Sequence, residues 1–219
     1  MIWFTSDLHL YHANVIKYDN RPFKSVHEMN DTIINRINQR VTVDDTLVLC
    51  GDISFGNPKM WRKSMSRIKC KNVVLVQGNH DKRIPKELFT IITTRLHMQI
   101  AGQKVIVSHY PFKWPWWKRL FRRSLRFEDR RIPNDGSCFL IHGHIHGAAA
   151  TDPHEAGPTD RAIHVGTMVN DYYPVSMKQI EKIINTRINK IRDKREKRAQ
   201  EDDKIVLRAI NNLRGNLFM

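Results

Sequence analysis

The chain has 219 residues and a hydrophobic fraction of 41%, which excludes a disordered chain and suffices for a folded core without disulfide bridges. Lysine and arginine number 37 against 22 acidic residues, so the net charge of +15 favours an anionic partner: nucleic acid, a phospholipid surface or a phosphorylated substrate. No run approaches the roughly 18 apolar residues of a membrane span, and no basic leader precedes the first acidic residue. The three cysteines fit neither a zinc ribbon nor a redox pair, so we expect reduced thiols in a cytoplasmic protein.

Short runs rich in isoleucine, valine and leucine recur along the chain and have the composition of strands. They carry little polar alternation, which is typical of strands buried on both faces. The runs cover residues 2–5, 46–50, 73–76, 104–107, 138–141 and 162–165.

Helix signals lie between the early strands. Ser25 and Glu28 stand at the spacing of a capping box, and Asn57 followed by Pro58 is typical of a second helix start. Residues 98–104 predict a hairpin instead. Alternating strands and helices followed by hairpin-like strands favour an α/β fold with mixed sheets, and a four-layer α/β/β/α sandwich fits both observations.

Two basic segments stand apart from a nearly neutral remainder. Residues 112–133 carry eight basic against two acidic residues, together with three tryptophans. Residues 176–219 carry twelve basic against six acidic residues. We therefore expect one domain over residues 1–175 with a basic, Trp-rich insertion at 112–133, followed by a basic amphipathic helical extension at 176–219.

The extension carries an isoleucine stripe at helical spacing, followed by the almost entirely charged residues 192–204. Asp202 or Asp203 predicts the cap of a second helix that ends at Gly215. We expect two amphipathic helices packed on the domain. The alternative is an arm for dimerisation or for nucleic acid.

Polar clusters follow five of the predicted strands, directly after each strand ends. Because strands of an α/β sheet end along a common edge where ligands bind, we expect the clusters to converge. Their members include Asp7, His9, Asp52, Asn79, His80, Asp81, His109, His142, His144 and His146.

Carboxylate and imidazole donors suit manganese, iron, zinc or similar divalent ions. A calcium site would need more oxygen ligands, and a structural zinc site would usually include cysteine. The donors suffice for two ions, provided that one aspartate bridges them. Two ions roughly 3.5–4 Å apart can clamp both the attacking and the leaving oxygen of a phosphoryl centre.

These clusters resemble the calcineurin-like metallophosphoesterase superfamily, whose signature runs DxH, GD, GNH, H and GHxH. All five blocks are present in order, and the resemblance covers roughly residues 1–175. The DLHxxHxN opening at 7–14 and the NRPF segment at 20–23 are similar to small bacterial and phage phosphoesterases. Residues 51–56 read GDISFG and lack the GDxVDRG pattern of the protein-phosphatase branch, which argues against a Ser/Thr phosphatase.

The resemblance implies a role for each residue. Asp52 would bridge the two metals, and His80 would donate a proton to the leaving group or stabilise the transition state. A hydroxide that bridges the metals would attack phosphorus in line. The ligands of the first metal would be Asp7, His9 and His146, and those of the second would be Asn79, His109 and His144.

Other polar residues near these blocks have weaker assignments. His12 and Asn14 are candidates to face the site, and Arg21 is a candidate contact for a substrate phosphate. We expect His142 to orient His144 or the strand end. His164 sits in a predicted strand, and we expect it to be structural.

Together these features predict a phosphoester hydrolase with two divalent ions, Mn²⁺ first and Fe, Zn or Ni as alternatives. The expected substrate is a nucleotide or another small phosphodiester or phosphomonoester. The alternative is a nuclease or nucleic-acid end phosphatase that uses residues 112–133 and 176–219, because tryptophan stacks on bases and arginine neutralises phosphates. A non-catalytic binding module is the least expected reading because no ligand is missing. The sequence leaves the oligomeric state open.

Overall fold

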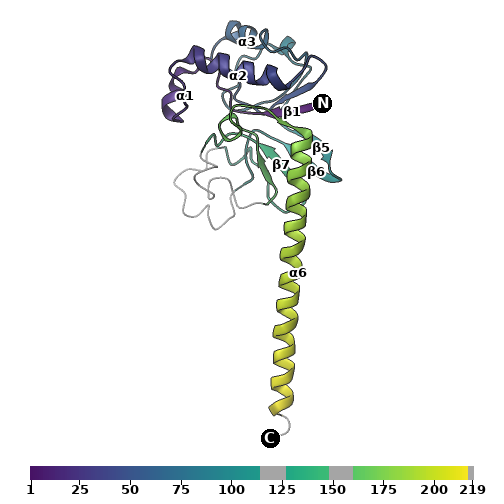
Figure 1. Cartoon of the computed structure of the whole chain (residues 1–219). Coiled ribbons are helices and arrows are strands. Elements are labelled where there is room, and N and C mark those ends of the chain that lie inside the picture. The colour runs from purple at the N-terminus through teal and green to yellow at the C-terminus, as the bar shows by residue number, and fades with distance from the viewer. Residues whose placement is uncertain (114–126, 148–159, 217–219) are drawn as a thin grey trace.

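The computed structural model describes residues 1–113, 127–147 and 160–216, with residues 207–216 as backbone only. Within this part of the chain, two mixed sheets pack face to face, and helices cover the outer face of the first sheet (Figure 1). The C-terminal residues form one long helix, α6 (Met177–Asn216), which extends away from the sheets. The predicted α/β class with mixed sheets and a helical C-terminal extension is therefore confirmed.

The first sheet has five strands in the order β4-β3-β2-β1-β9. Neighbouring strands are parallel from β1 to β4, and β9 pairs antiparallel with β1. The three longest strands match predicted runs, whereas the short edge strands β4 and β9 were not predicted. The strands are β1 Ile2–Thr5, β2 Thr46–Leu49, β3 Asn72–Val76, β4 Ile91–Thr93 and β9 Val175–Ser176.

The second sheet has four strands in the order β5-β6-β7-β8. The predicted hairpin joins β5 to β6, and Ala101 and Gly102 of its turn have φ values of 51° and 70°. Positive φ at both turn residues matches the right-handed twist of the paired strands. The strands are β5 Leu96–Ile100, β6 Gln103–Val107, β7 Phe139–His142 and β8 Ala162–His164.

Both predicted helix starts are present. The hydroxyl of Ser25 accepts a hydrogen bond from the backbone N–H of Glu28, while the Glu28 carboxylate accepts from Lys24 and not from Ser25. The side chain of Asn57 caps the other start, with Pro58 in its first turn. The helices are α1 Ala13–Tyr18, α2 Val26–Arg40 and α3 Pro58–Met65, with short 3₁₀ turns η1 Lys86–Leu88 and η2 Thr167–Asn170.

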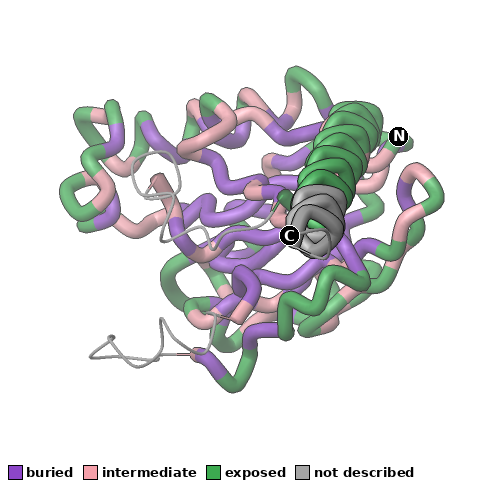
Figure 2. Tube along the Cα trace, turned by 90° about the horizontal axis from the view of Figure 1, so that it is seen from below, coloured by how far each residue is buried: buried purple, intermediate pink, exposed green. Residues whose placement is uncertain are grey.

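Alternation along the strands of the first sheet divides the core into two layers. Leu47 and Leu49 of β2 pack under the helices, whereas Val48 packs between the sheets with Phe139 and Ile141 of β7. Figure 2 shows the buried backbone running through the centre of the molecule. The outer face of the second sheet is contacted by residues of the 112–133 segment, Phe112 and Ile132.

The C-terminal segment forms one helix, α6 Met177–Asn216, and not the two helices predicted. Asp202 and Asp203 lie inside it and cap no second helix. The charged stretch contains strong helix formers without glycine or proline, and ion pairs such as Arg192–Glu196 support it at helical spacing. A run of charged residues therefore continues the helix instead of interrupting it.

The two halves of α6 differ in packing. Ile180 and Ile184 are fully buried against the core between the sheets, with Ile183 and Ile188 partly buried beside them. From Arg192 to Val206 every side chain is exposed, and the helix projects away from the sheets (Figures 1 and 2). The prediction that the whole extension packs on the domain is wrong for this stretch. Among the described residues, no helix is long and apolar enough to cross a membrane.

Candidate metal centre

The predicted clusters follow strands of two different sheets, which corrects the expectation of one shared sheet edge. Asp7 and Asp52 come after β1 and β2 of the first sheet, and His109 and His146 come after β6 and β7 of the second. The two sheets bring these strand ends together at one end of the sandwich. Convergence was therefore expected, but the face-to-face packing of the sheets produces it.

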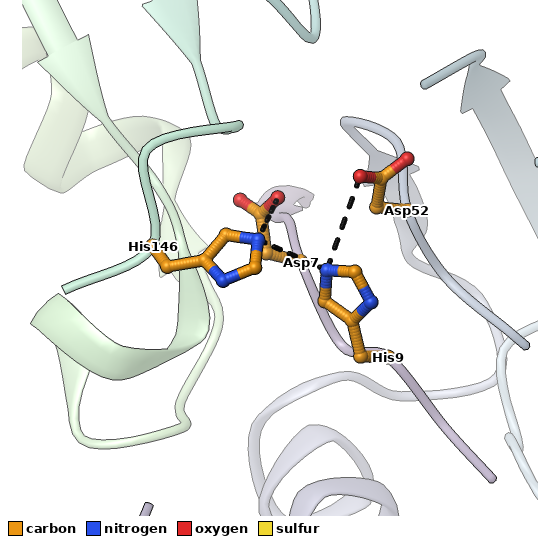
Figure 3. A group of neighbouring side chains, drawn as sticks. All are labelled: Asp7, His9, Asp52 and His146. Atoms are coloured by element: carbon orange, nitrogen blue, oxygen red, sulfur yellow. Dashed lines mark hydrogen bonds and ion pairs between the residues drawn. The ribbon is translucent and has the colours of Figure 1, made fainter. Parts of the chain in front are cut away.

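The first group of potential ligands contains Asp7, His9, Asp52 and His146, with one ligand atom of each within 4.8 Å of the others. Figure 3 shows the four side chains pointing toward a common region. The Nε2 atoms of His9 and His146 lie 3.0 Å apart. Nε2 of His9 is 3.9 Å from Oδ2 of Asp52, and Nε2 of His146 is 3.7 Å from Oδ1 of Asp7.

The second group contains Asp52, His109 and His144. Nε2 of His109 lies 3.3 Å from Oδ2 of Asp52 and 3.1 Å from Nδ1 of His144. Oδ1 of Asn79 is 3.2 Å from the same Nε2 atom, so the predicted amide ligand also faces this group.

Asp52 belongs to both groups, which is the position that a bridging carboxylate requires. Its Oδ2 atom faces His9 on one side and His109 on the other. Its Oδ1 atom accepts a hydrogen bond of 2.8 Å from the backbone N–H of His80, which holds the carboxylate in place. A buried carboxylate is costly unless it is paired. Cations bound in the two ligand groups would both lie next to Asp52 and would offset this cost.

The backbone is strained at the residues of this centre. A left-handed conformation is uncommon outside glycine and costs free energy, so it persists where the surrounding structure enforces it. Such residues cluster at functional sites. Five of the predicted ligands have positive φ, namely Asp7 (57°), His9 (51°), Asp52 (57°), His144 (75°) and His146 (45°).

Gly51 and Gly78 allow the loops of the centre to approach closely. A Cβ atom on Gly78 would lie 2.7 Å from the backbone nitrogen of Asp52, and one on Gly51 would lie 2.7 Å from Cγ of His109. Gly51 also has a φ of 91°. Both glycines of the GD and GNH blocks are therefore needed because side chains of the centre occupy the space that a Cβ would fill.

Hydrogen bonds on the far side of two imidazoles orient them. Nδ1 of His146 lies 2.6 Å from Oδ2 of Asp19, and Nδ1 of His109 lies 2.9 Å from the carbonyl oxygen of Cys50. Because these oxygens accept, Nδ1 is the donor in both rings and Nε2 is the nitrogen that faces the centre. Metal-binding histidines are typically held in this way.

Burial and charge set the protonation of these groups. Burial lowers the pKa of His9 and of His144 to about 2, which keeps both imidazoles neutral and able to bind a metal. Burial also opposes the charged form of His109, but the Asp52 carboxylate outweighs it and raises the pKa of His109 to about 9. A metal ion here would replace the proton as the cation beside Asp52.

His80 lies at the exposed side of the first group. Its ring centroid is 5.5 Å from that of His9. His12 stacks on the exposed ring of Phe55, with the ring centroids 4.2 Å apart, and its own ring centroid is 5.5 Å from that of His9. Asn14 is exposed in the first turn of α1, and none of the contacts described for the centre involves it.

Arg21 does not face a substrate, so that prediction is wrong. Its side chain is fully buried, and its guanidinium donates to the carbonyl oxygens of Asp7 and Leu8, each at 3.0 Å. It also pairs with Asp19. Arg21 therefore supports the backbone of the first ligand loop through these two carbonyl groups.

Sequence reasoning assigned no role to Asp81, although it belongs to the GNHD block. Its buried carboxylate accepts hydrogen bonds of 2.8–2.9 Å from the backbone N–H groups of Asp52, Ile53 and Gly78. Asp81 thus joins the second ligand loop to the third. Asp19 was also missed, since nothing in its local sequence indicates the contact with His146.

Nδ1 of His142 lies 2.9 Å from the carbonyl oxygen of Gly143, and the role of His142 in orienting His144 or the strand end stays a prediction. Its ring stacks on His164, with centroids 5.2 Å apart. Both ring nitrogens of His164 are shielded from solvent and have no hydrogen-bond partner among the described residues. Trp114, Trp116 and Trp117 of the predicted basic insertion lie outside the described residues.

The residues present fit a pair of divalent cations. Each group offers carboxylate oxygen and one imidazole that burial keeps neutral, His9 in the first group and His144 in the second, and divalent ions accept such donors. Burial raises the pKa of Asp7, a penalty on its charged form that a bound cation would offset. Two facing imidazole nitrogens 3.0 Å apart are also compatible with binding to one ion.

The comparisons with known proteins agree with this architecture. The model of the calcineurin-like phosphoesterase superfamily domain matches residues 1–172, so the chain belongs to that superfamily. Its members are generally hydrolases and typically use divalent metal ions, and their substrates carry phosphate.

Three relatives match the chain over most of its length. It is 33% identical over 185 residues to an uncharacterized protein of Methanocaldococcus jannaschii, covering 84% of this chain and 90% of that protein. It is 29% identical over 189 residues to the gene 66 protein of Mycobacterium phage L5, covering 75% and 84%. The crystal structure of a protein of unknown function from Aquifex aeolicus superposes with a TM-score of 0.64 at 29% identity, covering 84% of this chain and 99% of that one.

Proposed function

We propose that the protein is a phosphoester hydrolase with two divalent metal ions, acting on a nucleotide or another small phosphoester. The observation that carries the proposal is the position of Asp52 between two groups of imidazole and carboxylate donors. A single metal site would need no shared carboxylate. The two groups together match the requirement of in-line displacement at phosphorus.

In this proposal Asp7, His9 and His146 hold one ion, and Asn79, His109 and His144 hold the other. Asp52 bridges the two. Bound in this way, the ions would supply an activated water and neutralise negative charge that develops on the phosphoryl oxygens. The protein contributes a rigid set of donors, because Asp19, Arg21 and Asp81 fix the loops from behind.

His80 donates a proton to the leaving oxygen in this proposal. Its imidazole is exposed at the rim of the first group, where a bound ester would project its leaving group. Its backbone N–H donates to Asp52, which holds the backbone of His80 beside the bridging carboxylate. His12 and Phe55 form the adjoining wall, which a flat substrate group would contact.

The direct test is hydrolysis of paired chromogenic phosphomonoesters and phosphodiesters with added Mn²⁺, comparing the parent chain with Asp52→Asn. We expect metal-dependent turnover that falls at least about 10³-fold in the variant, because one substitution weakens both metal sites. Bound metal, counted by elemental analysis, falls with it. Asp31→Asn removes an exposed carboxylate that pairs with Arg67 and serves as the matched control.

Equal turnover in the parent and Asp52→Asn would contradict the proposal. Metal binding without hydrolysis of any ester would favour a binding module on the same fold. The ester that is cleaved faster also assigns the substrate class, which the ligand set leaves open.

A further inference from the structure

A cavity of about 530 Å³ lies beside the second ligand group, and none of the predicted metal ligands lines it. Its wall is made by the loop after β3, the loop between β4 and β5, Tyr110 and the turn at Asp129 and Arg130. This volume lies within the range of small-molecule sites, roughly 300–1,000 Å³.

Two of the lining residues are neighbours of the metal centre. Gly78 lines it and immediately precedes Asn79, and the backbone of Gly78 lies against that of Asp52. The ring of Tyr110 lines it too, with its centroid 5.0 Å from those of both His109 and His144. A substrate whose phosphorus lies at the centre can therefore extend its other end into this cavity.

Two arginines give the cavity its charge. Arg95 donates to the carbonyl oxygen of Arg130 at 3.3 Å, and Arg130 donates to the hydroxyl of Tyr110 at 3.0 Å. A guanidinium carries five N–H donors, so these bonds leave donors for a ligand. Asp129 is the one carboxylate among the described lining residues, so these residues together carry a net charge of +1.

We propose that this cavity binds a second phosphate of the substrate. Guanidinium groups match phosphate oxygens in geometry and charge, and the bonds are charge-assisted. The substrate would then carry at least two phosphates, one at the metal centre and one beside Arg95 and Arg130. The inference rests on the proposed function and adds the substrate class to it.

Competition against a chromogenic ester tests the inference on the full chain with Mn²⁺. The inhibition constants of adenosine 5′-monophosphate, adenosine 3′,5′-bisphosphate and a 5′-phosphorylated dinucleotide are compared. A ligand with the second phosphate should bind about tenfold more tightly than the monophosphate, as expected for charged hydrogen bonds. A preference for the bisphosphate indicates a free nucleotide, a preference for the dinucleotide indicates a nucleic-acid chain, and both support the subsite.

Variants then locate the effect. Arg95→Gln should reduce the advantage of the second phosphate severalfold, and Arg95→Gln combined with Arg130→Gln should abolish it. Asp129→Asn should increase it, because the variant removes the opposing charge. Arg67→Gln is the matched control, because Arg67 precedes β3 at the opposite end of the sheet and pairs with Asp31.

A ratio near one in the parent chain, or a ratio unchanged in the double arginine variant, would overturn the inference. Opposite shifts in Arg95→Gln and Asp129→Asn cannot come from unfolding, which keeps the test decisive if one variant is unstable. If the chromogenic ester is not hydrolysed at all, the proposed function fails separately. The same ligands are then titrated by calorimetry, and equal affinities for all of them reject the subsite as well.

Discussion

The loops of the candidate metal centre and helix α6 are built on opposite principles. In the loops, left-handed backbone and buried carboxylates accumulate over a few residues, and each costs free energy. In α6 the backbone stays regular through residue 216, while the side chains from Arg192 to Val206 contact solvent. Strain that a chain retains at one place points to function there. Because the side chains of this half of α6 are exposed, helix propensity is enough to explain its regular backbone.

The largest effect is expected from His80→Asn, which tests whether the residue at the rim of the strained loops takes part in the reaction. We expect kcat on an alkyl phosphoester to fall about 10²–10⁴-fold, the usual contribution of a positioned proton donor. Metal content should stay at the parent level, because the imidazole belongs to neither ligand group. Elemental analysis and steady-state kinetics on the same preparation separate the two effects.

Loss of metal together with activity would instead make His80 part of the metal centre. A leaving group of low pKa needs little protonation, so a nitrophenyl ester should lose less rate than an alkyl ester. The same loss on both esters would contradict the role of proton donor.

The two halves of α6 offer the next test. Ile184→Ala removes a fully buried side chain from the core between the sheets, and we expect it to lower the free energy of unfolding by about 2–4 kcal/mol. Ile205→Ala removes the same atoms from a position that is 56% exposed, and it should change stability by less than about 0.5 kcal/mol. Denaturant titration of both variants gives the comparison directly. Similar losses would mean that the outer half of α6 is covered in solution.

The fold was predictable where local signals and tertiary packing agree. Strand runs such as 2–5 coincide with observed strands, and Ser25 and Asn57 begin helices as their capping chemistry requires. The edge strands β4 and β9 span only three and two residues, so partners and not composition define them. The continuous α6 was missed because residues 192–204 have no apolar stripe, although charge pairs at helical spacing sustain a helix.

For the centre, the sequence located the polar clusters but not the contacts behind them. Convergence of the blocks followed from strand ends, and the structure brings their side chains together. Asp19 and Arg21 lie beneath the first loop through contacts that depend on its three-dimensional course. An arginine near a phosphate site suggests substrate binding in a sequence, whereas burial assigns Arg21 to backbone support. Whether the predicted ligands bind metal stays a prediction for the Asp52→Asn experiment.

Asp81→Asn tests how much one buried carboxylate contributes to the stability of the ligand loops. Its carboxylate accepts three backbone N–H groups, and an amide would turn a donor toward one of them. We expect a loss of about 1–3 kcal/mol of stability, because a buried donor is left unsatisfied. Mn²⁺ affinity should weaken as well, since Asp52 loses its anchor. Asp31→Asn on α2 is the exposed control, and equal effects in the two variants would reject the assignment.

The smallest expected effect concerns His164, the strand histidine behind the centre. Burial lowers the pKa of His164 well below its ordinary value, so the folded chain favours the neutral ring while the unfolded chain binds a proton near pH 6.5. Stability should therefore be complete above about pH 6.5 and should decline as the pH falls below it, by up to about 1.4 kcal/mol per pH unit.

His164→Phe keeps a ring to stack on His142 and removes two shielded nitrogens that lack described partners. Its free energy of unfolding at pH 8 should equal or exceed that of the parent, because no buried polar atom is left unpaired. Between pH 6.5 and 5 it should lose less stability than the parent, and the difference between the two slopes reports the proton that His164 takes up on unfolding. If the free energy of unfolding depends on pH in the same way in both proteins, another group binds the proton. The stacking of His164 on His142 would then contribute to packing and not to the pH dependence.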